Sequence, residues 1–171
     1  MKSFRTPFSE EDIAQLHVGD RIELSGYIFT GRDAVLPRIV EMVEDGSIED
    51  LGICLKGGVV FHTAVSPAGV GPTSSNKVEI EESFPGLSKG GIKLHLGKGK
   101  ISNETVRALN HYNAVYAIIP PVTALLNDRT MEQQIVAFPE EGMEAMYRLK
   151  VEKYPCIIAA AHGISIFDEE R

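Results

Sequence analysis

A repeated order of strand, glycine-containing turn and helix constrains the fold of this chain more than any other feature of its sequence. Residues 21–30 alternate apolar and polar side chains, which is the period of a half-buried strand. The turn 31–33 follows, and apolar residues then recur at helical spacing over 34–43. The same order returns at residues 92–96, where a short strand is followed by a glycine turn and by Ser102, a predicted helix N-cap. This alternation predicts the α/β class.

The remaining segments complete a single predicted domain. Further predicted elements are a short helix capped by Ser9, strands at 57–65, 114–119 and 135–138, short helices at 122–126 and 143–149, and a C-terminal hairpin of residues 156–160 and 164–167. Segment 66–77 is rich in Gly, Pro and Ser, and we predict a loop there. Because no linker or repeat divides the chain, residues 1–171 are predicted to form one domain.

Charge and cysteine content narrow the classes of function. The net charge of -7 repels polyanions, so neither nucleic acid nor a membrane surface is an expected partner. An anionic ligand must therefore be bound by a few local basic groups. Cys54 and Cys156 lack metal-ligand spacing and are predicted to be buried free thiols, and no metal site is predicted. No stretch approaches the length of a membrane span, and we expect a cytoplasmic protein.

Three glycine-containing segments that follow strands carry cations or hydroxyl groups. They are residues 31–33, with Arg32, residues 71–77, with Lys77, and residues 97–99, with Lys98. Ligands of α/β sheets bind outside the strand ends, so these segments are expected to converge. Arginine offers a bidentate fork to a carboxylate and lysine a point charge, while glycine lets backbone amides approach a ligand. A dianion of the size of fumarate would suit such a site.

These same segments carry a resemblance to a known family. Residues 30–33 (Thr-Gly-Arg-Asp), 70–75 (Val-Gly-Pro-Thr-Ser-Ser) and 97–99 (Gly-Lys-Gly) resemble, in order, the signature loops of the β region of class I fumarase and L-tartrate dehydratase. The pair Phe61-His62 and residues 142–149 also match. The resemblance implies a three-layer β/β/α swivelling domain. It also implies that the domain closes over a [4Fe-4S] cluster carried by a separate α subunit, in a hetero-oligomer, with a homodimer as a further option.

The resemblance also assigns roles to individual residues. Arg32, Lys77 and Lys98 would bind the carboxylates of a small dicarboxylate substrate, in a site completed by Asp33, Gly71 and Pro72. Thr73, with Ser74 second, would place a hydroxyl near the proton that moves, and the open iron of the partner's cluster would act as a Lewis acid on the hydroxyl of the substrate.

Two departures from the family pattern leave other functions open. The family usually has a histidine where this chain has Leu36, and an arginine where it has Lys77. Both changes favour an alternative in which the chain is a diverged or non-catalytic partner subunit. A phosphate-binding module is a second alternative, because residues 71–77 approach the Walker pattern, although Asn76 and Val78 stand at two of its fixed positions. His62, in an apolar strand, is predicted to be a core or supporting residue.

Overall fold

The structure, a computed structural model, describes residues 1–73, 77–120 and 122–168. Four parallel strands form its centre: β2 (Arg21–Thr30), β3 (Val59–Phe61), β6 (Leu94–Gly97) and β7 (Val115–Ile118). Thr30 pairs with Phe61, Phe61 with Leu96, and Leu96 with Ala117. Because these residues stand in one row, all four strands end at the same edge of the sheet, which we call the carboxyl edge.

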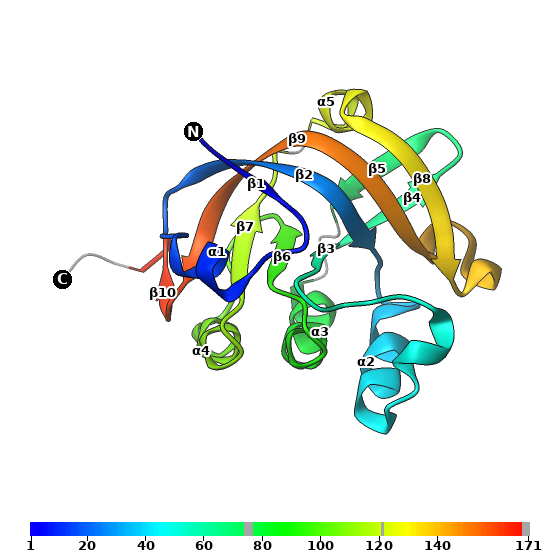
Figure 1. The fold of residues 1–171 in the computed structure, drawn as a ribbon, viewed down its shortest axis with the longest axis horizontal. Helices are drawn as coiled ribbons and strands as arrows, with labels where there is room; N and C mark the ends of the chain where they lie inside the picture. Colours follow the sequence, from blue (N-terminus) through cyan, green and yellow to red (C-terminus); the bar gives the residue numbers. More distant parts are fainter. Residues whose placement is uncertain (74–76, 121, 169–171) are drawn as a thin grey trace.

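A long antiparallel strand bends this sheet into a closed ring. β9 (Met146–Ala161) pairs with β2 along most of its length and with β7 near its end, so the pairings β2–β3–β6–β7–β9–β2 close on themselves. β8 (Thr130–Ala137) and β10 (Ile164–Ser165) extend β9, and β1 (Lys2–Arg5) adds a parallel partner to the start of β2. In Figure 1, β2 and β9 arch over one side of β3, β6 and β7.

Helices cover the other side of the central strands (Figure 1). They are α2 (Leu36–Asp45), α3 (Lys77–Lys89) and α4 (Asn103–His111). Each of these helices begins at the carboxyl edge. Helix α2 follows β2, and α4 follows β6. Helix α3 follows a hairpin that comes after β3, and it leads back to the start of β6. The hairpin itself consists of β4 (Thr63–Ser66) and β5 (Gly69–Thr73). Four short helices complete the fold: α1 (Glu10–Ala14), η1 (Ile48–Leu51), α5 (Thr123–Asp128) and η2 (Pro139–Glu144).

The alternation of strand side chains divides the core. Ile28 and Phe61 face the inside of the ring, where the largest apolar cluster lies, whereas Phe29 and Val60 face α2. A third cluster, under α3 and α4, contains Phe84 and seven other buried residues. The sheet is therefore buried on both faces, which explains the nearly continuous apolar runs in its central strands.

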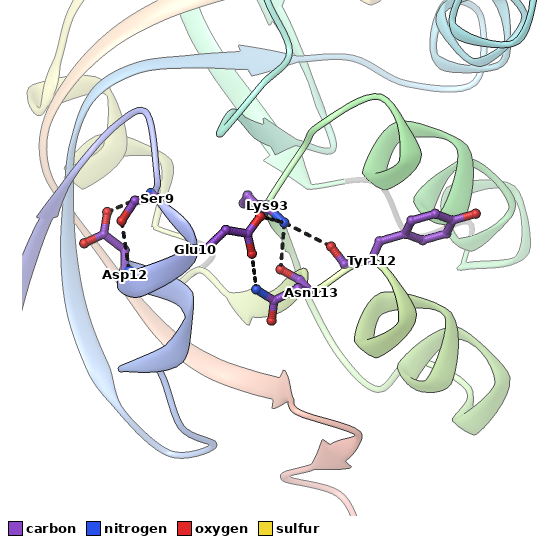
Figure 2. A network of polar contacts seen from close by, with 6 residues as sticks. All are labelled: Ser9, Glu10, Asp12, Lys93, Tyr112 and Asn113. Atoms are coloured by element: carbon purple, nitrogen blue, oxygen red, sulfur yellow. Dashed lines mark hydrogen bonds and ion pairs between the residues drawn. The ribbon is translucent and has the colours of Figure 1, made fainter.

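A polar network fixes the opposite, amino edge of the sheet (Figure 2). The Lys93 Nζ atom, just before β6, donates to the carbonyl oxygens of Tyr112 and Asn113 at 3.0 and 3.3 Å and lies 2.7 Å from Glu10 Oε1. The Asn113 amide also donates to Glu10. Hydrogen bonds from Lys93 and Asn113 lower the pKa of Glu10. This network ties α1, whose Ser9 N-cap forms a reciprocal capping box with Asp12, to the central strands.

Several elements match the sequence predictions, and four predictions were wrong. Strand 21–30 and the caps at Ser9 and Ser102 are confirmed. Segment 57–65 is not one strand, because β3 and β4 are separated by His62 and pair in different sheets. Segment 66–77 is not a loop throughout, because residues 69–73 form β5 and Lys77 begins α3. Residues 143–149 are not one helix: Met143 and Glu144 end η2, whereas residues 146–149 belong to β9, where pairing with β2 and β8 on both sides overrides a helix-compatible spacing. Cys54 is exposed rather than buried, because it lies in the turn before β3.

Candidate active site

The turns after β2, β3 and β6 lie side by side at the carboxyl edge. The strand ladder continues one step beyond the paired residues: Gly31 N donates to Phe61 O at 3.2 Å, and His62 N donates to Leu96 O at 3.1 Å. Gly31, His62 and Gly97 therefore form the next row of the sheet. The structure thus brings the turn that carries Arg32 and the turn that carries Lys98 to one edge, with the end of β3 between them.

The turn 31–33 is held tightly against the start of α2. The Arg32 carbonyl oxygen accepts hydrogen bonds from Val35 N at 3.1 Å and Leu36 N at 2.9 Å. A Cβ atom at Gly31 would lie 2.7 Å from Leu36 Cδ2, so only glycine fits without displacing a core side chain. Arg32 and Asp33 are half-buried, and Leu36 is buried in the apolar cluster under α2. Leu36, at the position where the resemblance implies a histidine, is thus a packing residue in this chain.

The second motif runs through the β4–β5 hairpin to the first residue of α3. Gly71 lies inside β5, where its carbonyl oxygen accepts a hydrogen bond from Thr63 Oγ1 at 2.8 Å. Thr73 ends β5 opposite Thr63, the residue after His62, so the backbone of Thr73 lies close to the carboxyl edge. Pro72 belongs to β5 and Lys77 starts α3, but their side chains, like that of Thr73, lie outside the described part of the structure. Ser74 lies outside the described residues altogether.

The third turn is held in place by a buried tyrosine. The Tyr116 hydroxyl donates to Gly99 O at 3.0 Å, and a Cβ atom at Gly97 would lie 3.2 Å from the Tyr116 ring. Burial raises the pKa of Tyr116, so the hydroxyl stays a donor at ordinary pH. Lys98, between these two glycines, is exposed.

The starts of the helices are joined to one another as well as to the strands. Glu81 Oε1, in the first half of α3, accepts from Ser102 N at 2.8 Å and from Thr105 Oγ1 at 2.7 Å. Ser102 also caps α4 through Thr105 N. Helix starts carry partial positive charge, and three of them meet at the carboxyl edge. The Glu81 carboxylate offsets part of this charge at the start of α4.

A buried histidine pair lies at this edge: His62 is buried as predicted, but its contact with His95 was not predicted from the sequence. His62 Nε2 lies 3.3 Å from His95 Nδ1, and His95 Nε2 lies 2.9 Å from Ser88 Oγ. All three side chains are buried, and the Phe84 ring stacks on His95. Burial lowers the pKa of His62 to about 3 and that of His95 well below its usual value, so both rings are neutral at ordinary pH. The available signal was weak: each histidine stands beside apolar residues in a strand, which is also the pattern of an ordinary core.

Buried polar atoms at the carboxyl edge are left unsatisfied. Within the part of the chain that the structure describes, neither His62 Nδ1 nor Thr30 Oγ1 has a hydrogen-bond partner. Thr30 is the last residue of β2 and His62 the first residue after β3. Buried polar groups are nearly always hydrogen-bonded, so unsatisfied groups at one edge indicate a place where a further polar partner is received.

The described residues contain no metal-binding group. No three His, Cys, Asp or Glu side chains among residues 1–73, 77–120 and 122–168 come together in a way that could hold a metal ion. Cys156 is buried in β9 and Cys54 is exposed in a turn, so the two thiols do not provide the set of cysteines that a [4Fe-4S] cluster needs. A separate property concerns membranes: among the described residues, no helix is both long and apolar enough to cross one.

Comparison with known proteins identifies the family of this α/β chain. The model of the Fumarase C-terminus family matches residues 3–170. The chain therefore belongs to the Fumarase C-terminus family.

Relatives of two kinds match the chain. The L(+)-tartrate dehydratase subunit beta of Escherichia coli K12 is 28% identical over 99% of this chain and 88% of its own length. A Methanocaldococcus jannaschii protein, provisionally named as the same kind of subunit, is 32% identical over 94% of this chain and 88% of its own length. The anaerobic class I fumarate hydratase of Escherichia coli K12 is 29% identical, but the match covers 85% of this chain and only 28% of that enzyme. The relatives are thus components of lyases, either as a separate β subunit or as part of a longer chain.

Proposed function

We propose that this chain is the β subunit of a two-component hydro-lyase that reversibly adds water to, or removes it from, a small dicarboxylate. Fumarate and malate are the first candidates for the substrate and tartrate the next. The observation that carries this proposal is the meeting of the Arg32 and Lys98 turns, on either side of β3, at an edge where three helices begin. The names of the relatives support the reaction class.

The spacing of the two turns suits a four-carbon dianion. Two strand spacings separate the backbones of β2 and β6, which places the turns about 10 Å apart. Side chains as long as those of Arg32 and Lys98 can converge across that distance on the two ends of one small ligand. Arg32 would bind one carboxylate in bidentate fashion, and Lys98 and Lys77 would act as point charges, with Asp33, Gly71 and Pro72 completing the site.

In this proposal the reacting groups come from two chains. Thr73, with Ser74 as the second candidate, places a hydroxyl near the proton that moves, because β5 returns to the edge opposite Thr63. A partner α subunit would hold the [4Fe-4S] cluster, which would supply a Lewis acid when bound. The arch of β2 and β9 on one side and the helices on the other support a three-layer β/β/α arrangement, a domain that swivels over the partner to complete the site.

A second candidate function is that of a non-catalytic partner subunit, and Leu36 favours it. The side chain at this position packs in the core, so the chain keeps its fold without the histidine that the family usually has there. The phosphate-binding alternative is less well supported. A Walker loop follows a parallel strand, whereas Gly71 lies within an antiparallel hairpin.

An anaerobic hydratase assay distinguishes these candidates. The chain is mixed with a cluster-bearing α subunit from the same source, and wild type is compared with Arg32→Ala and Lys98→Ala. Loss of a charged hydrogen bond to the substrate is expected to lower kcat/KM by about tenfold to hundredfold in each variant. Lys56→Ala, which removes an exposed cation before β3, serves as the control and should retain full activity.

Two outcomes would contradict the proposal. A stable complex that turns over neither fumarate, malate nor tartrate would favour the non-catalytic subunit. Failure of the two chains to associate would reject the subunit assignment itself.

A further inference from the structure

A line of buried hydrogen bonds runs through the molecule to the carboxyl edge. Ser88 lies near the end of α3, far along the helix from its start at this edge. Its hydroxyl meets His95 Nε2 at 2.9 Å, and His95 Nδ1 meets His62 Nε2 at 3.3 Å. His95 pairs with Val60, two residues before His62, so the line approaches the edge step by step and ends at the ring of His62. The last nitrogen of the line, His62 Nδ1, is one of the buried atoms for which the described residues supply no hydrogen-bond partner.

The two rings can be protonated in only two consistent ways. A neutral imidazole carries one proton, so one ring nitrogen donates and the other accepts. If Ser88 donates to His95, then His95 Nδ1 donates to His62 Nε2, and His62 Nδ1 carries a proton. If the order is reversed, His62 Nε2 donates to His95 and His62 Nδ1 presents a lone pair. The identity of the group that meets His62 Nδ1 therefore sets the direction of every bond in the line.

Burial keeps this line uncharged. Neither ring is exposed, and the Phe84 ring packs against both of them, at 4.8 Å from His62 and 4.3 Å from His95. The pKa of His62 is lowered to about 3, so a positive imidazolium is excluded at ordinary pH. A neutral donor next to an anion gives a directed hydrogen bond, and it does so at the same strength throughout the neutral pH range.

We propose that the Ser88–His95–His62 line donates towards the carboxyl edge, and that the Nδ1–H group of His62 is a neutral hydrogen-bond donor to the dianion bound there. This inference rests on the proposed function only in taking a small dicarboxylate as the ligand. His62 supplies the donor, while His95 and Ser88 are positioning residues that hold it in the donating tautomer. The unsatisfied nitrogen receives its partner when the dianion occupies the edge.

Two variants of His62 separate this role from a structural one. The side-chain amide nitrogen of asparagine can take the place of the donating imidazole Nδ1, whereas the side-chain amide oxygen of glutamine can take the place of the accepting Nε2. His62→Asn therefore keeps the donor at the edge and loses the bond to His95, while His62→Gln keeps that bond and loses the donor. The probe is succinate, a four-carbon dianion with no double bond or hydroxyl to react. Its dissociation constant is measured with the reconstituted complex of both chains, and the melting temperature of each variant is recorded alongside.

The expected results run in opposite directions. His62→Gln should weaken succinate binding by about tenfold or more with little change in melting temperature, since it removes a hydrogen bond to a charged group. His62→Asn should bind succinate within about threefold of wild type but melt at a lower temperature, since it breaks the buried line. Equal losses of affinity in both variants, or an unchanged affinity in His62→Gln, would overturn the inference.

Succinate binding and turnover can fail independently, so the two measurements distinguish the role of His62 from the proposed hydro-lyase activity. Succinate binding with the expected pattern, but without turnover of any hydroxy acid, would overturn the hydro-lyase assignment and support the His62 donor. Absence of succinate binding by the wild-type complex would overturn the His62 donor, whatever the complex turns over.

Discussion

The neutral histidine pair predicts an unusual loss of stability in mild acid. His62 and His95 are buried without charge in the folded chain, where the pKa of His62 is about 3 and that of His95 is also far below the ordinary value of 6.5. In the unfolded chain both rings titrate near 6.5. Below that pH the unfolded state binds more protons than the folded state, so the free energy of unfolding falls as the pH falls. The loss begins near pH 6.5 and continues, for His62, down to about pH 3.

The size of the effect follows from the two shifts. Each fully developed shift contributes about 1.4 kcal/mol per pH unit. Allowing for partial protonation near 6.5, the pair should lower the free energy of unfolding by about 3 kcal/mol between about pH 6.5 and about pH 5. That is a large part of the roughly 5–15 kcal/mol by which an ordinary domain is stable.

Urea unfolding at several pH values measures this slope directly. The carboxylates with lowered pKa values, Glu10, Asp20 and Asp45, are ionised in both states until lower pH, so they add little above about pH 5. A His62→Gln, His95→Gln double variant should lose most of the slope, even if it is less stable at pH 7.5 than wild type. The reasoning is refuted if wild type keeps a constant free energy of unfolding over this window, or if the double variant shows the same slope.

Three further predictions concern packing and the amino edge. Lys93→Ala should lower the free energy of unfolding in urea by about 1 to 3 kcal/mol, because the side chain is only 13% exposed and bonds two carbonyl oxygens and a carboxylate. The control Lys89→Ala, which breaks an exposed ion pair, should lower it by under about 1 kcal/mol. Equal losses in the two variants would contradict this contrast. Phe84→Ala should lower the free energy of unfolding by about 3 to 5 kcal/mol in the same assay, because the ring is fully buried between α3 and the sheet. A loss below about 1 kcal/mol would mean that this cluster is loosely packed. Leu36→His should destabilise the chain by about 2 kcal/mol or more at neutral pH, because it places a polar ring in the apolar cluster under α2, and unchanged stability would argue that this position can face the site.

Local signals in the sequence were sufficient for the strand–turn–helix units. The bounds of β2, the caps at Ser9 and Ser102, and the turns at 31–33 and 97–99 all follow from periodicity, hydrogen-bonding side chains and glycine within a few residues. The order of these units also predicted that the cation-bearing turns would meet, because parallel strands end at a common edge. That prediction is the basis of the candidate site.

Other features depended on partners that are distant in the chain. Val70 N bonds to Asn127 Oδ1 at 2.7 Å, a contact across 57 residues that holds β5 in a segment rich in turn formers. β9 is a strand because β2, β7 and β8 line its two sides, although part of its sequence also fits a helix. The histidine line was hidden for the same reason, since His62 and His95 are 33 residues apart and become neighbours only when β3 and β6 pair.

The sequence by itself determined the α/β class, the glycine turns with their cations and the family to which the chain belongs. Short-range rules decide these features, because a strand period, an N-cap or a glycine turn involves residues close together along the chain. Only the tertiary structure decided that the sheet closes through β9, that Leu36 is a core residue and that a neutral histidine line ends at the site. Each of these depends on which strands pair and in which register, and that choice is made by burying the whole set of apolar faces at once.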